Sequence, residues 1–87
     1  MSRIRRIKNG YLECVIYEFE EYIKIDKLEV FTEFRNQGIG THFMKQLIEE
    51  YDKDIVLTVL YDRPISFYKR LGFEMETQDT MIFRKGE

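Results

Sequence analysis

The sequence has little of what would place a protein in a membrane or outside the cell. Its 87 residues contain one cysteine, Cys14, which cannot form an internal disulfide and is expected to be a small core residue. The basic residues 1–8 are not followed by the apolar run of a secretory signal. No apolar stretch approaches the roughly 20 residues that span a bilayer. We therefore expect a cytoplasmic protein without a membrane anchor.

Charge of one sign is also lacking. The 14 Lys and Arg residues nearly balance the 16 Asp and Glu residues, and a net charge of −2 does not favour nucleic acid or a membrane surface as the main partner. His42 is the one histidine, and no His and Cys residues have the spacing of metal ligands, so no metal is expected. What is present is a 44% hydrophobic content with seven Phe and six Tyr. This suits one small core and a single domain over residues 1–87.

The first strands are predicted from a turn dipeptide. Asn9-Gly10 lies between the strand-like residues 4–8 and 11–19, and it is typical of a type I′ hairpin turn with two positive φ angles. Both faces of residues 11–19 are largely apolar, which predicts a sheet covered on both sides. A second turn is expected near Glu20-Glu21.

The third predicted strand, residues 22–31, changes phase within its length. Ile23 and Ile25 alternate in one phase, whereas Leu28 and Val30 alternate in the other. One extra residue near Asp26-Lys27 would produce this shift, so we predict a β-bulge there.

The second half of the chain alternates between helical and strand patterns. Apolar residues recur with helical spacing from Gly38 to near Asp52, and residues 55–60 read as a short buried parallel strand. Pro64 suits the first turn of a second helix, with Asp62 as its cap and Gly72 as its stop. Two last strands are expected at residues 73–76 and 80–84. The predicted fold is an α/β (α+β) mixed, mostly antiparallel twisted sheet with two main helices packed on it.

The segment most informative about function is RNQGIGT at residues 35–41, between a strand and a helix. Two glycines one residue apart let the backbone approach a ligand, and the first helical turn leaves N–H groups without internal partners. These donors and the helix dipole suit a phosphate. A Gly-x-Gly before a helix is equally typical of a close-packed turn. A P-loop is excluded because Gly-Lys-Ser/Thr is absent, and a dinucleotide fingerprint is excluded because Phe43 stands where a small residue is needed.

A second segment, ISFYKRLGF at residues 65–73, makes the pattern specific. Together with Leu28-Glu29-Val30 and the Arg-x-x-Gly-x-Gly turn, it resembles the GNAT superfamily of N-acetyltransferases over roughly residues 11–87. The turn looks like the family's acetyl-CoA pyrophosphate motif, and residues 65–73 resemble its Phe-Tyr-x-x-x-Gly-Phe segment.

The resemblance implies acetyl-CoA as co-substrate and a set of contacts to it. The strand at Leu28 and Val30 would pair with the pantetheine arm, which in this family inserts where two parallel strands separate beside a bulge. The residues implied at the pyrophosphate are Arg35, Gln37, Gly38, Ile39, Gly40 and Thr41, mainly through backbone amides.

The resemblance also implies catalytic roles. Tyr68 matches the tyrosine that protonates the departing thiolate in many members, although periodicity alone would make it a half-buried aromatic side chain. A strand N–H near Val30 would stabilise the oxyanion. Glu29 is the nearest carboxylate for a general base, with Asp26 second, while many members deprotonate the amine through water.

The sequence also departs from the family. A strand and two helices usually precede the first hairpin and wall the acceptor pocket, whereas about ten residues precede Tyr11 here. This predicts an open acceptor side, which suits a protein amine better than a small metabolite, or a homodimer in which a second subunit completes the wall. Tyr61 stands where the family often has Asn, and Asn36 replaces a common Gly.

The sequence is compatible with three functions. The first is an acetyl-CoA-dependent N-acetyltransferase acting on a primary amine, which the retained Tyr68 favours. The second is a catalytically silent acyl-CoA-binding module that regulates or docks onto a partner protein. The third is nucleic-acid binding through a basic edge, although charged edge strands ordinarily serve to resist aggregation. The residues of that edge are Arg3, Arg5, Arg6 and Lys8.

Overall fold

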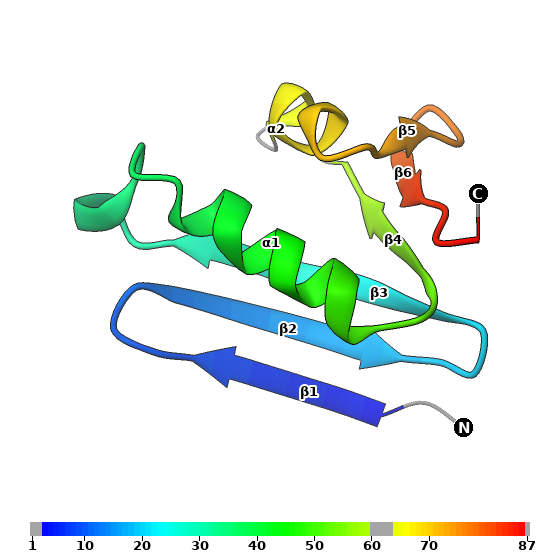
Figure 1. The fold of residues 1–87 in the computed structure, drawn as a ribbon, viewed down its shortest axis with the longest axis horizontal. Helices are drawn as coiled ribbons and strands as arrows, with labels where there is room; N and C mark the ends of the chain where they lie inside the picture. The colour runs from blue at the N-terminus through cyan, green and yellow to red at the C-terminus, as the bar shows by residue number, and fades with distance from the viewer. Residues whose placement is uncertain (1–2, 60–63, 87) are drawn as a thin grey trace.

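The computed structural model describes residues 3–59 and 64–86. These residues form a mixed sheet with two α-helices and one short 3₁₀ helix (Figure 1). In chain order the elements are β1 (Arg3–Lys8), β2 (Leu12–Glu18), β3 (Tyr22–Val30), η1 (Thr32–Phe34), α1 (Ile39–Glu50), β4 (Asp54–Thr58), α2 (Ile65–Arg70), β5 (Glu74–Met75) and β6 (Thr80–Phe83).

The strands are ordered β1-β2-β3-β4-β6-β5 across one sheet. The β3–β4 pair is parallel, and the other pairs in the described residues are antiparallel. The crossover between β3 and β4 contains α1, as a parallel connection requires. The predicted α+β class and mostly antiparallel sheet are confirmed.

The β1–β2 hairpin forms as predicted, but its turn type was predicted wrongly. Neither Asn9 nor Gly10 has a positive φ, so the turn is not type I′. Instead the Asn9 side chain accepts hydrogen bonds from the backbone N–H groups of Tyr11, at 2.7 Å, and Leu12, at 3.0 Å. Because this side chain satisfies the turn donors, the backbone needs no left-handed residue. The turn at Glu20-Glu21 is closed by the Phe19 N–H bond to the Tyr22 carbonyl.

The predicted bulge in β3 is confirmed by the register. Val15 of β2 pairs with Lys27 and the next residue, Ile16, pairs with Ile25, which leaves Asp26 as the extra residue. The bulge keeps apolar side chains on the helix side of the sheet both before and after it.

The sheet opens immediately after this bulge. Parallel pairing between β3 and β4 ends at Ile25 and Leu57, whereas β3 continues to Val30. The described part of β4 therefore pairs with only the first half of β3, and Figure 1 shows the two strands diverging.

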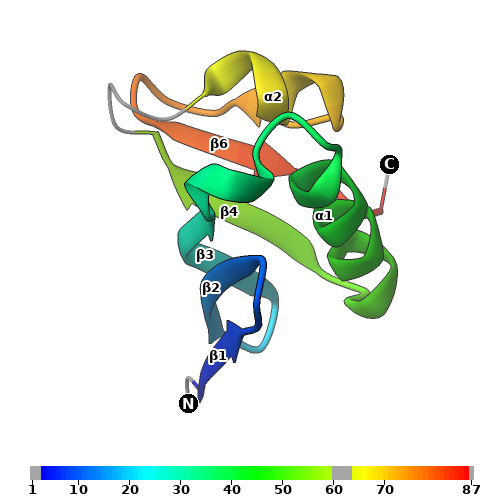
Figure 2. The ribbon, with the colours of Figure 1, turned by 90° about the vertical axis from the view of Figure 1, so that its left-hand side faces the viewer.

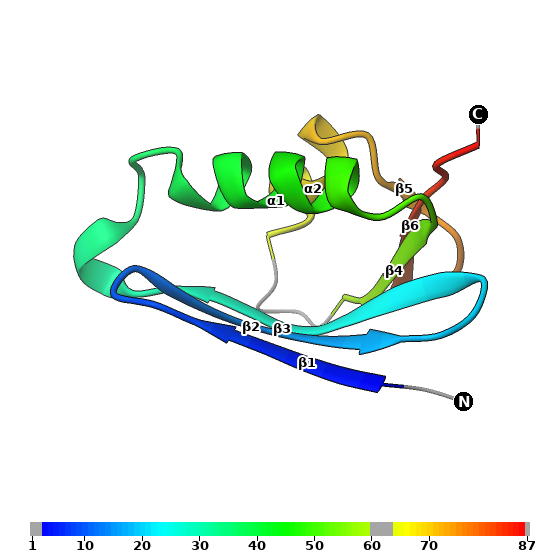
Figure 3. The same cartoon turned by 60° about the horizontal axis from the view of Figure 1, so that its bottom comes forward.

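One hydrophobic core lies between the sheet and the two helices. Buried side chains from α1, α2 and one sheet face join a single cluster, and α1 and α2 cover the same face (Figures 2 and 3). The expectation of a sheet covered on both sides is thus wrong for the described residues, because the apolar residues on the other face have no helix over them. The fully buried members are Cys14, Ile16, Ile23, Ile25, Met44, Ile55, Leu57 and Met81.

The second helix begins one residue later than predicted. Pro64 is its N-cap, not part of its first turn, and its carbonyl accepts the Phe67 N–H at 3.0 Å. Gly72, with φ of +105°, ends it as predicted. The predicted cap Asp62 and the substituted position Tyr61 lie outside the described residues, as do Leu60 and Arg63. No helix among the described residues is long and apolar enough to cross a membrane.

Candidate functional site

A cleft of about 840 Å³ lies where β3 extends past β4, beside the N-terminus of α1. It takes residues from four places in the chain: the second half of β3, the loop before α1, the first turn of α1, and α2. The lining residues are Lys27, Leu28, Glu29, Val30, Phe34, Arg35, Asn36, Gly38, Ile39, Gly40, Thr41, Pro64, Phe67, Tyr68 and Arg70.

The loop before α1 points unpaired donors at this cleft. Gly38 caps the helix in the left-handed conformation, with φ of 77°, and Asn36 is also left-handed, with φ of 63°. The first intrahelical bond runs from the His42 N–H to the Gly38 carbonyl at 2.9 Å. Within the described residues, the preceding N–H groups, those of Ile39, Gly40 and Thr41, make no backbone hydrogen bond. Such donors at a helix N-terminus attract an anion.

The two glycines have different roles. A Cβ on Gly38 would meet no atom within 4 Å, so its left-handed backbone is what requires glycine. A Cβ on Gly40 would lie 3.4 Å from Phe67 Cζ and from Val30 Cγ2. Gly40 therefore lets the start of α1 pack against α2 and β3. The contacts at Gly40 are those of the close-packed turn that was one expected alternative, whereas Gly38 makes no such contact and lines the cleft.

The charges around the cleft also suit an anion. No acidic residue lies in the first turn of α1, and three cations line the cleft: Lys27, Arg35 and Arg70. Arg35 is held in place because its Nε donates to the Val30 carbonyl oxygen at 2.9 Å. Its guanidinium also lies 4.0 Å from the Glu29 carboxylate.

The main chain of β3 presents polar groups to the gap. Phe31 donates its N–H to the Tyr11 carbonyl on the β2 side, at 2.9 Å. Because backbone direction alternates along an antiparallel strand, Leu28 and Val30 direct their N–H and C=O groups toward the open side. Arg35 already occupies the Val30 carbonyl. Within residues 3–59 and 64–86, no hydrogen bond is found for the Val30 N–H or for the two backbone groups of Leu28, so these groups can pair with an extended ligand.

Tyr68 lines the cleft from α2. Its side chain is 2% exposed, and its ring packs edge-on against Phe67 and Phe73, with centroids 5.0 and 5.5 Å apart. It is thus a core aromatic residue and a cleft residue at once. Fixed packing of this kind holds a hydroxyl in one position.

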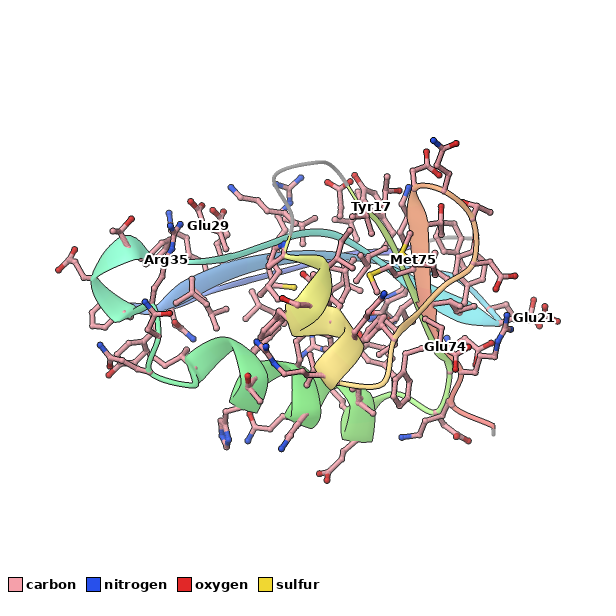
Figure 4. The ribbon with its side chains drawn as sticks, turned by 90° about the horizontal axis from the view of Figure 1, so that it is seen from above. Tyr17, Glu21, Glu29, Arg35, Glu74 and Met75 are labelled. Atoms are coloured by element: carbon pink, nitrogen blue, oxygen red, sulfur yellow. The ribbon has the colours of Figure 1, made fainter. Side chains whose placement is uncertain are left out.

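Glu29 lies on the opposite face of the sheet from the helices. Its β2 partner is Glu13, and its carboxylate lies 3.9 Å from the Lys27 ammonium and 4.0 Å from the Arg35 guanidinium. Figure 4 shows the side chains of Glu29 and Arg35 close together. Lys27 donates to Glu13 at 2.9 Å and lowers the pKa of that carboxyl, first through this hydrogen bond. The carboxylate of Glu29 is therefore at the cleft mouth, flanked by cations.

The cleft contains all of the residues predicted to bind the cofactor or act in catalysis except Gln37 and Asp26, the second candidate for the base. The Gln37 side chain donates to the Glu33 carbonyl at 3.4 Å. Six lining residues were not predicted as site residues: Lys27, Phe34, Asn36, Pro64, Phe67 and Arg70. The sequence offered a signal for Phe67, because Phe67 adjoins Tyr68 in the motif at residues 65–73. It offered none for Phe34, which reaches the cleft because the chain forms the 3₁₀ turn η1.

The chain was compared with known families and structures. A family model described as "Acetyltransferase (GNAT) domain" matches residues 4–75. The ribosomal-protein-S18-alanine N-acetyltransferase of Escherichia coli superposes with a TM-score of 0.79 at 19% identity, covering 94% of this chain and 69% of that one. No curated protein matches the chain.

Two further similar structures differ from each other in how much of their own length this chain covers. The anti-CRISPR protein AcrVA5 gives a TM-score of 0.73 at 22% identity, covering 92% of this chain and 97% of that one. The PaiA N-acetyltransferase of Thermoplasma acidophilum, in complex with coenzyme A, gives 0.75 at 18% identity, covering 85% of this chain and 53% of that one. The chain likewise spans 55% of a putative GNAT acetyltransferase from Bacteroides thetaiotaomicron. These likenesses show the fold, and the family model shows that this chain belongs to the GNAT acetyltransferase family.

Proposed function

We propose that this protein is an acetyl-CoA-dependent N-acetyltransferase that modifies a primary amine of a protein. The observation that carries the proposal is the meeting, in one cleft, of the unpaired amides of α1, the unpaired main chain of β3 and the buried Tyr68. The structural likeness to a GNAT enzyme in complex with coenzyme A supports the choice of co-substrate.

The cleft supplies complementary groups for each part of coenzyme A. The amides of Ile39, Gly40 and Thr41 would bind the pyrophosphate, with Arg35 beside it. The pantetheine arm carries amide groups, so it would pair with the backbone of β3 at Leu28 as a strand pairs with a sheet edge, and the Val30 N–H would remain for the thioester oxygen. This arrangement puts the thioester near Tyr68.

The cleft is lined by residues from both faces of the sheet. Leu28 and Val30 pair with Cys14 and Leu12, whose side chains lie in the core, whereas Glu29 lies on the uncovered face. A coenzyme entering at α1 would therefore meet an acceptor that arrives from the uncovered face. This face has no helix over it among the described residues, so a protein segment has room to reach the thioester.

The chemistry requires a neutral amine. For a lysine with a pKa near 10.4, removing the proton at pH 7 costs about 4.6 kcal/mol. Glu29 would take this proton directly or through water. The amine nitrogen then bonds to the thioester carbon, and the Val30 N–H donates to the oxyanion. As the C–S bond breaks, Tyr68 gives its proton to the coenzyme thiolate.

The test is transfer of labelled acetyl from acetyl-CoA to lysine peptides and to proteins of a cell lysate. Tyr68→Phe is expected to lower transfer by about 10²- to 10⁴-fold, the usual contribution of a positioned acid, while coenzyme A still binds. Tyr22→Phe is the control, because Tyr22 is 38% exposed and does not line the cleft. Tight coenzyme binding without transfer by the wild type would instead identify a silent acyl-CoA-binding module.

A further inference from the structure

The uncovered face of β1, β2 and β3 carries a distinct set of side chains. Residues that pair across the strands share a face, so the residues opposite the core positions can be assigned from the register. We call this surface the open face. Figure 4 shows two of its residues, Tyr17 and Glu29, on the side of the sheet away from α1. Its residues are Ile4, Arg6, Lys8, Glu13, Val15, Tyr17, Tyr22, Lys24, Asp26, Lys27 and Glu29.

Apolar side chains form a band across the open face. The register places Ile4 beside Tyr17. Lys24 follows on β3 and interrupts the row, and apolar side chains resume at Val56 of β4 and Ile82 of β6. Ile4 is 54% exposed, the largest exposed fraction among the large hydrophobic side chains described. A band of this kind suits contact with another chain.

The charges on the open face are unbalanced. It carries four cations and three carboxylates, Glu13, Asp26 and Glu29, an excess of one positive charge, although the whole chain has a net charge of −2. Lys27 lies within ion-pair distance of two of these carboxylates, Glu13 and Glu29. The other three cations, Arg6, Lys8 and Lys24, form no ion pair within the described residues, and we call them the cationic group.

This surplus of positive charge adjoins the proposed reaction site. Lys27 and Glu29 belong both to the open face and to the cleft lining. Arg6 pairs with Val15, and Val15 pairs in turn with Lys27. Lys24 precedes Lys27 by three residues on β3. An acceptor whose amine enters the cleft from this face must therefore lie across the cationic group.

From these observations we infer that the open face binds an acidic segment of the acceptor protein, with Asp or Glu beside the reacting amine. This inference rests on the proposed function. Carboxylates of the segment form ion pairs with the cationic group, and apolar side chains of the segment pack on the band at Ile4 and Tyr17. Single-stranded nucleic acid fits less well, because the whole chain carries a net charge of −2.

The test compares three lysine peptides with blocked N-termini and acidic, neutral or basic flanks. We expect kcat/KM for the acidic peptide to exceed that for the neutral peptide about tenfold at 50 mM salt, since two or three exposed ion pairs contribute a few-fold each. The preference should shrink toward 500 mM salt, where charges are screened over about 4 Å. The double variant Arg6→Glu with Lys24→Glu should abolish the preference for the acidic peptide. Its kcat/KM for the neutral peptide should stay within about twofold of the wild-type value.

The matched control is Lys45→Glu with Lys69→Glu, which makes the same charge change at exposed sites on α1 and α2 outside the cleft lining. Equal rates for the acidic and neutral peptides, or equal effects of the two double variants, would overturn the inference. Arg6→Gln with Lys24→Gln repeats the test with a milder substitution if the reversal impairs folding.

Binding of the acidic peptide, measured by fluorescence anisotropy, separates this inference from the proposed function. Binding that is lost in Arg6→Glu with Lys24→Glu, without any acetyl transfer, would support the acidic docking surface and contradict the enzyme. Acetyl transfer at the same rate to the acidic, neutral and basic peptides would contradict the acidic docking surface and support the acetyltransferase activity. A single-stranded oligonucleotide that binds the open face more tightly than the acidic peptide would overturn the inference in favour of nucleic acid.

Discussion

The Gly38 position offers the most direct test of the proposed phosphate site. Gly38 has φ of 77°, which L-amino acids adopt at an energetic cost of roughly 1–2 kcal/mol and which is least compatible with a β-branched side chain. Gly38→Val therefore either retains this strain or relaxes the loop to another conformation. In both cases the amides of α1 no longer point together at a phosphate, so coenzyme A binding should weaken strongly.

The size of the effect can be worked out as a shift in melting temperature. Coenzyme A at 100 times its Kd should stabilise the wild type by about 2.7 kcal/mol. Since 1 kcal/mol corresponds to about 4–8 °C for a domain of this size, the wild-type Tm should rise by roughly 10–20 °C. Gly38→Val should show a lower Tm without ligand and a rise of only a few degrees at the same coenzyme concentration. The assay is a thermal melt by circular dichroism, with Kd from calorimetry.

A second glycine separates strain from binding. Gly72 also has a left-handed backbone, with φ of +105°, and an added Cβ would lie 3.1 Å from Phe83 Cε2. Gly72→Ala should therefore lose stability too, but Gly72 does not line the cleft and the full coenzyme-induced rise should remain. A full rise in Gly38→Val, or an equal loss of the rise in both variants, would refute the assignment of the phosphate loop.

Two further predictions concern ionisable groups. Glu29→Gln should lower kcat by about 10²-fold or more if Glu29 is the base, with the coenzyme-induced rise in Tm unchanged, and an undiminished kcat would assign the deprotonation to water. Burial raises the pKa of Tyr51, whose hydroxyl contacts Arg5 at 3.0 Å, above its usual value of 10.0, so folding favours the neutral phenol. This stability is fully present below about pH 10 and is lost as pH rises through the folded pKa, so urea unfolding between pH 8 and 11.5 should show a shallower decline for Tyr51→Phe.

Local sequence patterns predicted much of the fold and of the candidate site. The phase change around Asp26 predicted the bulge because side chains alternate strictly along a strand. The start of α1 at Ile39 followed from its apolar period and from Gly38 before it. Residue types did not predict the turn at Asn9-Gly10, since the Asn9 side chain supplied the hydrogen bonds that a left-handed backbone would otherwise provide.

Side-chain surroundings were harder to predict from the sequence. Tyr68 was assigned to the site through its motif, but its near-complete burial between Phe67 and Phe73 depends on how α2 sits on the sheet. Gln37 was placed among the cofactor contacts through its backbone amide, yet it lies outside the cleft lining, and its side chain turns back to η1. The positions of these side chains depend on the path of the backbone in the folded protein. The spacing of apolar residues in the sequence does not predict that path.

The sequence by itself determined the order of strands and helices, the bulge and the glycine loop, because each depends on residues close together in the chain. Only the tertiary structure decided that β4 leaves β3 after Ile25, so that groups from β3, the loop and α2 share one cleft. It also decided that both helices cover the same face, which leaves the cationic group and the apolar band uncovered. These features depend on pairing and packing between residues far apart in the chain, and local propensity does not specify them.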